Sequence, residues 1–237
     1  MQFDEARLAG LGDIELFAGL PPEAIAEIEA KVRWHQFAPD EQVFDKQSDT
    51  LEVYFVVSGT VRILSYVQPD REVALANVTA GNYFGELAAI DGKERSARVV
   101  AIEASLLASV EGPAFMDFMR SHPAVALRVL ERFARIIRAL DNRVIDLSTL
   151  TETQRVLVEL VRLAKPDPRR ADSFYIADLP NHKEIAAWAG SSRETVAQTI
   201  GELARMGVVE RRSMSLIVHD WPKLQILARS GIAMSDA

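Results

Sequence analysis

The sequence predicts an α+β protein with three parts: an N-terminal antiparallel β-roll or jelly roll, a long dimerisation helix, and a C-terminal winged helix-turn-helix. Short runs of β-branched and aromatic residues fill 33–112, each bounded by Gly, Pro, Asp or Asn, as is typical of a small all-β unit. A long helical pattern with a heptad repeat follows, and then two short helices around a glycine. We therefore expect boundaries that give 1–121, 122–150 and 151–237.

The composition is that of a soluble globular protein, with 237 residues of which 49% are hydrophobic and 26% charged. The chain has no cysteine, which excludes disulfides, zinc–thiolate fingers and cysteine-ligated iron–sulfur clusters. No run approaches the roughly eighteen apolar residues of a membrane span. The start, MQFDEARLAG, has acidic residues where a signal peptide is basic. We expect a cytoplasmic protein that does not bind membranes.

The net charge of −7 is unevenly distributed along the chain. Residues 1–150 hold 15 basic and 23 acidic side chains, whereas 151–237 hold 12 basic and 11 acidic ones. A near-neutral C-terminal part with arginines gathered on one face can still bind phosphate groups. The charge therefore does not exclude a nucleic-acid partner.

The N-terminal part should open with a short amphipathic helix over 21–32, PPEAIAEIEAKV, because proline is tolerated in a first helical turn. In VVSGTVRIL we expect two strands joined as a tight hairpin at Ser58 and Gly59, since glycine supplies the positive φ of such a turn. About eight strands in about eighty residues predict a small barrel or jelly roll.

Two helices should follow, a short one in PAFMDFMRSH and a long one from Pro123 to about Leu150. Apolar residues recur along the long helix at alternating spacings of three and four, which is a heptad seam. We expect a parallel homodimer along this seam through 122–150. The alternative is the buried face of a monomeric helix. The seam residues are Leu130, Phe133, Ile137, Leu140, Val144 and Leu147.

The stretch GNYFGELAAIDGKERSARVVA places Glu86 ten positions before Arg95 and Ser96. A phosphodiester is bound by a guanidinium, a hydroxyl and free backbone N–H groups such as those at the start of GELAAI. A carboxylate suits a sugar hydroxyl instead. The combination predicts a ribose joined to a phosphate, and the alternative is a salt bridge between Glu86 and Arg95 inside an empty barrel.

The C-terminal part, NHKEIAAWAGSSRETVAQTIGELARMGVVE, has the spacing of a helix-turn-helix. Gly190 should take a left-handed conformation at the turn, and Ser191 or Ser192 should cap the second helix. The N-terminal end of that helix is the part that reads base edges in the major groove. We expect Arg193, Glu194 and Gln198 to read bases, and the helix start before them and a two-stranded wing to contact phosphates. The expected DNA contacts are Asn181, His182, Lys183, Ser192, Arg193, Glu194, Gln198, Arg211 and Arg212.

FGELAAIDGKERSARVVA resembles the phosphate-binding cassette of cyclic-nucleotide-binding domains. Together with SSRETV it makes the chain similar, from about residue 14 to 228, to the cyclic AMP receptor protein/FNR family of bacterial transcription regulators. The resemblance implies that Glu86 binds the ribose 2′-hydroxyl and that Arg95 and Ser96 bind the cyclic phosphate. The backbone of Gly85, Glu86, Leu87 and Ala88 assists. Some members of the family keep the fold and bind no cyclic nucleotide.

The base of the nucleotide is less well defined by the resemblance. The family's adenine-binding Thr-Ser pair on the long helix falls on Leu140 and Asp141, which departs from the pattern. A carboxylate can accept from the amine of adenine or from the N1–H and N2–H₂ edge of guanine. Cyclic AMP and cyclic GMP are both open. The alternative is that Asp141 is a solvent-exposed flank of the seam, paired with Arg138.

The resemblance further implies a homodimer on a pseudo-palindromic site in double-stranded DNA, with RNA polymerase as a partner. A metal-dependent enzyme is not expected, because the four histidines are scattered and only His35 lies in the barrel region. No serine has the two flanking glycines of a nucleophile elbow. A regulatory subunit that senses nucleotides and acts on another protein is a further alternative, disfavoured by the helix-turn-helix.

Overall fold

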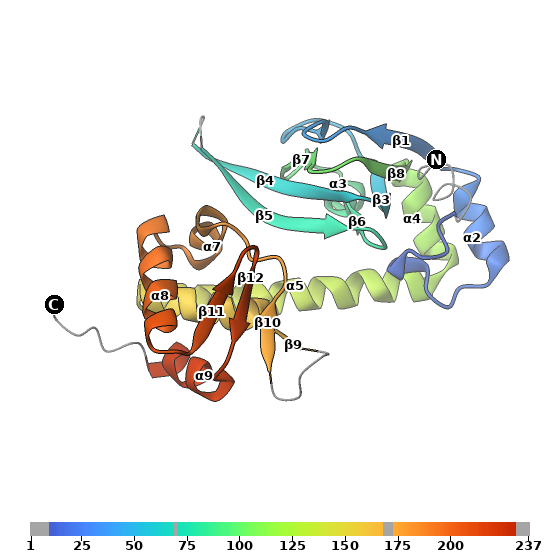
Figure 1. The fold of residues 1–237 in the computed structure, drawn as a ribbon. Helices are drawn as coiled ribbons and strands as arrows, with labels where there is room; N and C mark the ends of the chain where they lie inside the picture. The colour runs from blue at the N-terminus through green and yellow to red at the C-terminus, as the bar shows by residue number, and fades with distance from the viewer. Residues whose placement is uncertain (1–9, 69–70, 168–172, 231–237) are drawn as a thin grey trace. The chain divides into compact units, whose positions relative to one another are not determined.

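The computed structural model describes residues 10–68, 71–167 and 173–230, and it contains two compact units (Figure 1). They divide inside helix α5 (Pro123–Thr149), between Ile136 and Ile137. The expected α+β class is confirmed, with a β-roll first, a long helix next and a winged helix-turn-helix last. None of the helices in the described ranges is long and apolar enough to cross a membrane.

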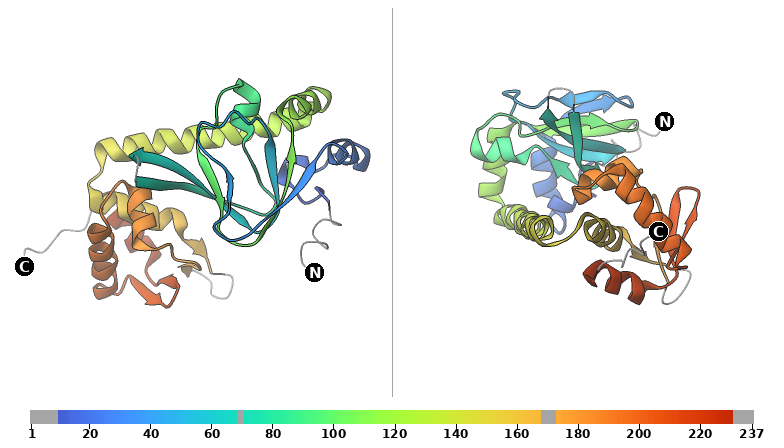
Figure 2. Two further views of the ribbon diagram at one scale, coloured as in Figure 1. Left: turned by 90° about the horizontal axis from the view of Figure 1, so that it is seen from above. Right: turned by 90° about the vertical axis from the view of Figure 1, so that its left-hand side faces the viewer.

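The β-roll consists of two four-stranded antiparallel sheets. The strand orders are β1-β8-β3-β6 and β2-β7-β4-β5, so neighbours within a sheet are mostly far apart in sequence. Figures 1 and 2 show how the two sheets curve around each other. The strands are β1 (Arg33–Phe37), β2 (Gln42–Phe44), β3 (Val53–Ser58), β4 (Thr60–Gln68), β5 (Arg71–Thr79), β6 (Tyr83–Phe84), β7 (Arg98–Ala101) and β8 (Ser105–Val110).

The expected hairpin at Ser58 and Gly59 is wrong, although the two strands and the turn exist. Strand β3 pairs with β6 and β8, whereas β4 pairs with β5 and β7, so the turn carries the chain from one sheet to the other. Gly59 has φ +83°, and a Cβ there would lie 2.4 Å from Ser105 Oγ. Glycine is therefore required by a close approach as well as by the backbone conformation.

Two apolar clusters hold the N-terminal unit together. One fills the inside of the roll, where Phe44, Tyr54 and Phe84 meet between the sheets. The other packs the outer face of β3 and β8 against helices and contains Phe55 and Phe118. Its helical elements are η1 (Glu15–Phe17), α2 (Pro22–Glu29), α4 (Gly112–Ser121) and the start of α5. Helix α2 confirms the helix expected over 21–32.

Helix α5 has the expected bounds to within one residue at its C-terminal end and runs for 27 residues, or about 40 Å. Phe133 packs against the core of the β-roll unit. The other seam residues are exposed, with between 49% and 63% of each side chain accessible. The seam is therefore not the buried face of a monomeric helix. These exposed residues are Leu130, Ile137, Leu140, Val144 and Leu147.

In the C-terminal unit α6 packs against three other helices, which can be followed in Figure 2. The short strand β9 follows α6, and residues 168–172 lie outside the described ranges. Helix α9 was not expected. The elements are α6 (Glu152–Leu163), β9 (Lys165–Pro166), β10 (Phe174–Ile176), α7 (His182–Ala189), α8 (Arg193–Arg205), β11 (Val209–Arg212), β12 (Ser215–Val218) and α9 (Trp221–Ser230), with sheet order β11-β12-β10-β9.

Candidate ligand and nucleic-acid sites

The Gly-Glu-Leu turn lies between β6 and the short helix α3 (Glu86–Asp91). Gly85 has φ +87°, and a Cβ there would lie 2.8 Å from Arg95 Nη1 and 2.9 Å from the Glu52 carbonyl oxygen. The absence of a Cβ at Gly85 thus lets the Arg95 side chain approach the backbone of the turn closely. Glu86 and Ala88 are buried, whereas Leu87 is exposed.

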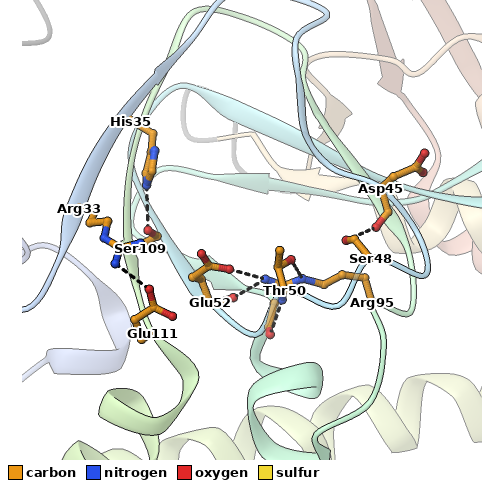
Figure 3. A network of polar contacts seen from close by, with 10 residues as sticks. Arg33, His35, Asp45, Ser48, Thr50, Glu52, Arg95, Ser109 and Glu111 are labelled. Atoms are coloured by element: carbon orange, nitrogen blue, oxygen red, sulfur yellow. Dashed lines mark hydrogen bonds and ion pairs between the residues drawn. The ribbon is translucent and has the colours of Figure 1, made fainter.

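Arg95 is almost completely buried, with 2% of its surface exposed. Its guanidinium donates three hydrogen bonds: Nε to Thr50 Oγ1 at 3.0 Å, Nη1 to the Gly85 carbonyl at 3.0 Å, and Nη2 to the Glu52 carbonyl at 2.8 Å (Figure 3). It also lies 4.1 Å above the ring of Phe44. These contacts fix the guanidinium firmly, since a buried charge is tolerated only where it is paired and hydrogen-bonded.

The carboxylate nearest to Arg95 is that of Glu52, with Oε2 3.6 Å from Nη2. Burial lowers the pKa of Arg95, and Glu52 and Glu86 partly oppose this. The alternative of a salt bridge between Glu86 and Arg95 is not what the structure has. Thr50 and Glu52 are therefore site residues that sequence reasoning missed, because no local pattern marks a loop whose partner lies more than forty residues away.

Glu86 is also buried, at 7% exposed, and it makes no ion pair within 4 Å with any residue that the structure describes. Burial raises the pKa of Glu86, and the charge of Arg132 on α5 opposes this most strongly. Arg132 lies 4.1 Å above the ring of Tyr83, the residue before Phe84. Arg132 is, after Thr50 and Glu52, a third site residue that sequence reasoning missed. A buried carboxylate in this position is well suited to accept a hydrogen bond from a hydroxyl group.

Ser96 is exposed, and its hydroxyl has no hydrogen-bond partner within the described ranges. The residue before it, Arg95, lines a pocket of about 620 Å³. This volume falls within the range of small-molecule sites. The pocket is lined by Lys46, Gln47, Asp49, Leu51, Gly92, Lys93, Glu94 and Arg95.

Leu140 and Asp141, the candidates for base recognition, lie on α5 beyond Ile136 and so belong to the C-terminal unit. Both are exposed. The ion pair considered between Asp141 and Arg138 is not among the contacts of the described residues. The role of Leu140 and Asp141 in base recognition stays a prediction.

The helix-turn-helix has the expected turn. Gly190 has φ +59° and ends α7, and Ser192 caps α8 by accepting a hydrogen bond from the Thr195 N–H at 3.0 Å. The Ser191 hydroxyl instead donates to Glu152 Oε2 at 3.1 Å. Of the two serines offered as a cap, Ser192 is the one used.

Two arginines hold the C-terminal end of α7. Arg143 of α5 donates to the carbonyls of Ala187 and Trp188. Arg155 of α6 donates to the Ala189 and Gly190 carbonyls at 2.7 Å each, and to the Leu150 carbonyl at 2.8 Å. These carbonyls have no partner within their own helix, so cations at this end are stabilising.

The expected base readers lie on the exposed face of α8 at its start. Arg193 and Glu194 are exposed, with no partner for either side chain within the described residues. Gln198 is also exposed and donates to Glu202 Oε1 at 3.3 Å. Two of the three readers are thus unengaged by the protein and available to a ligand.

The expected phosphate contacts differ from one another in the structure. Asn181 caps α7 through Oδ1, which accepts from the N–H groups of Lys183 and Glu184. The Lys183 side chain is exposed. Burial and, to a smaller extent, the charges of Arg211 and Arg193 lower the pKa of His182 and so favour its neutral form. His182 can therefore act as an N–H donor rather than as a cation.

The two wing arginines are not equivalent. Arg212 donates to both carboxylate oxygens of Glu210, at 2.7 and 3.3 Å, and His219 contacts the same carboxylate at 3.0 Å. Arg211 is exposed and makes no side-chain contact with a described residue apart from its effect on His182. Arg211 is thus the better candidate for a phosphate.

Comparison with known proteins finds a separate family match in each of the two compact units. Residues 34–122 match the cyclic nucleotide-binding domain, and residues 154–227 match the Crp-like helix-turn-helix domain. The chain is 31% identical over 194 residues to the cyclic AMP receptor protein of Thermus thermophilus, covering 82% of this chain and 87% of that one. The chain belongs to the cyclic AMP receptor protein family. The resemblance expected from the two motifs is confirmed.

Other members of the cyclic AMP receptor protein family cover nearly the whole chain. The CRP-like cAMP-activated global transcriptional regulator of Mycobacterium tuberculosis is 26% identical over 215 residues, which is 90% of this chain and 96% of that one. The structure of Thermus thermophilus catabolite activator protein matches with a TM-score of 0.53 and 29% identity, covering 92% and 99%. A CooA mutant from Carboxydothermus hydrogenoformans shows the same fold, with a TM-score of 0.74 at 20% identity over 90% and 93%.

Membership of this family identifies the chain as a transcription regulator with a cyclic nucleotide-binding domain and a helix-turn-helix DNA-binding domain. It also confirms that the chain is not an enzyme. Among the residues described, no group of three or more His, Asp or Glu could hold a metal ion.

Replacing Glu86 by glutamine should raise the free energy of unfolding at pH 7 by on the order of 1 kcal/mol. Because burial raises the pKa of Glu86 above its ordinary value of 4.5, the folded wild type loses stability as pH rises from about 4.5 through the raised pKa. Glutamine has no charge to bury, so the gain should vanish below pH 4.5. Urea unfolding at pH 4 and pH 7 measures this, with the exposed Glu94→Gln as control. A gain that is larger at pH 4 would contradict the assignment.

Proposed function

We propose that the chain is a homodimeric transcription regulator whose DNA binding responds to a cyclic nucleotide bound in the β-roll. Arg95 and Ser96 would bind the cyclic phosphate, Glu86 the ribose 2′-hydroxyl, and the backbone of 85–88 would assist. One observation supports this above the others: Glu86 and Arg95 are both buried, yet Glu86 does not pair with Arg95. Two unlike buried charges kept apart suit a ligand that has both a hydroxyl and a phosphate.

Cyclic AMP is the first candidate effector, because relatives across the family are named as cAMP-activated regulators. Cyclic GMP stays a second candidate through Leu140 and Asp141. An exposed carboxylate at Asp141 can accept from either base, while Leu140 offers no hydroxyl.

The exposed seam of α5 supports dimerisation through 122–150. Five apolar side chains at heptad spacing would be covered by the same seam of a second copy. In such a dimer the two α8 helices should sit about 34 Å apart, on successive turns of the major groove of a pseudo-palindromic site. In this proposal, 1–121 binds the nucleotide, 122–150 forms the dimer and 151–237 binds DNA. RNA polymerase is the proposed partner at promoters.

A regulator of the same family that binds no cyclic nucleotide is the second candidate function. It is favoured by the three hydrogen bonds and the carboxylate with which the protein itself satisfies Arg95. The two candidates differ in whether a nucleotide binds at all.

Calorimetric titration should therefore show binding of cyclic AMP or cyclic GMP, weakened about tenfold or more in Ser96→Ala by loss of a hydrogen bond to a charged phosphate. Ser96 is the better variant than Arg95→Ala, since it is exposed and removing Arg95 would break three internal hydrogen bonds. Ser121→Ala, another exposed serine, is the control. Absence of binding by either nucleotide, with DNA binding intact, would favour the second candidate.

Arg193→Ala should reduce discrimination at one base pair of each half-site by about tenfold or more, because a bidentate contact to guanine is lost. Arg211→Ala should weaken cognate and scrambled DNA alike and lower the salt dependence by about one phosphate contact. Gel-shift titrations on both sites at several salt concentrations measure both effects. Equal losses on the two sites for Arg193→Ala would overturn its role as a base reader.

Leu140→Glu should convert the dimer to a monomer at micromolar concentration, because a charge would be buried in the seam. Asn142→Glu adds the same charge on the exposed opposite face of α5 and should leave the dimer intact. Sedimentation velocity distinguishes the two. A dimer that survives Leu140→Glu would place the interface elsewhere.

A further inference from the structure

Glu52 occupies the position directly before β3 and faces Arg95 with its side chain (Figure 3). Its Oε2 lies 3.6 Å from Arg95 Nη2, and the same oxygen is buried with no hydrogen-bond donor among the described residues. The Glu52 side chain as a whole is 20% exposed, against 1% for that of Arg95. The Glu52 carboxylate thus lies near the Arg95 guanidinium and is the more exposed of the two groups.

Most of the N–H donors of Arg95 already form hydrogen bonds within the protein. A guanidinium has five N–H groups, and three of them bind Thr50 Oγ1 and the carbonyls of Gly85 and Glu52. One N–H remains on each of Nη1 and Nη2, and the Glu52 carboxylate lies beside Nη2. A phosphate that binds Arg95 must use the same two N–H groups and therefore meets the carboxylate.

We propose that Glu52 is a built-in competitor of the ligand phosphate for Arg95 and thereby sets the affinity for the cyclic nucleotide. This inference rests on the proposed function. The charge of Arg132 acts on Glu86 more strongly than that of Arg95, so the carboxylate that faces Arg95 is that of Glu52. A cyclic phosphate would therefore bring a second anion to the same buried guanidinium. Glu86 is the proposed partner of the ribose hydroxyl, whereas Glu52 has no proposed contact with the ligand, so removing its charge should not weaken binding.

The rest of the site lets Glu52 move away while Arg95 stays in place. Three neutral oxygen atoms and the ring of Phe44 at 4.1 Å hold the guanidinium independently of the carboxylate. The Glu52 carbonyl is one of these acceptors, and it belongs to the backbone, so it remains when the side chain turns outward. Binding would exchange one anion for another at a preformed cation.

Titration of Glu52→Gln with cyclic AMP and with cyclic GMP tests the proposal. Glutamine keeps the size and the backbone carbonyl but removes the competing charge. The dissociation constant of the preferred nucleotide should fall about tenfold, equal to about 1.4 kcal/mol. Glu94→Gln removes an exposed charge from the pocket that Arg95 lines, where the Glu94 carboxylate makes no ion pair with Arg95, and it should change the constant by less than about twofold.

A second variant keeps the proposal testable if Glu52→Gln does not fold. Glu52→Asp keeps the charge but withdraws it by one methylene, so it should bind the nucleotide with an affinity between those of the wild type and Glu52→Gln. Urea unfolding of each variant shows whether it is folded at the temperature of the titration. A purely structural Glu52 would give the opposite sign, because both variants would lose stability and bind more weakly.

Each outcome decides the matter. Tighter binding by Glu52→Gln than by the wild type, with Glu94→Gln unchanged, supports the proposal, as does binding by Glu52→Gln where the wild type shows none. Unchanged or weaker binding by Glu52→Gln, with a wild type that binds, overturns the role of Glu52 and leaves the proposed function standing. No binding by the wild type or any variant overturns the nucleotide function and the role of Glu52 together.

Discussion

A guanidinium buried within the β-roll unit is the constraint on which the ligand site depends. Arg95 cannot shed its charge, so the protein has to surround it with acceptors. It does so with acceptors from two separate segments, the loop before β3 and the turn at Gly85, which meet around a guanidinium carried by the chain before β7. The positive φ of Gly85 and the stacking on Phe44 follow from the same need. One cation thereby joins the loop before β3 to the turn at Gly85.

The local elements of the fold could be predicted from the sequence, and the pairing of strands could not. Heptad spacing placed α5 to within a residue, because helix periodicity is contained in the sequence of the helix itself. Gly59 marked a turn correctly, yet positive φ fits a hairpin and a change of sheet equally well. Strand β3 pairs with β8, about fifty residues away, and no pattern within either strand specifies that partner.

The site was predictable where chemistry is concentrated in a short motif and not where it is assembled by folding. Glu86, Arg95 and Ser96 follow from one stretch of sequence, whereas Glu52 and Arg132 reach them only through tertiary structure. In the wing a signal was present: Glu210 and Arg212 are two residues apart on a strand, so they share a face and can pair. The counter-ion of Arg212 was therefore available from the sequence, and Arg211 could have been preferred.

The grip of Arg143 and Arg155 on the end of α7 has a mechanical consequence. Four successive carbonyls, from Ala187 to Gly190, are bonded to side chains of α5 and α6, so α7 cannot turn relative to either helix without breaking several of these bonds at once. The last turns of α5, the start of α6 and the end of α7 are therefore held together as one rigid block across the turn near Leu150.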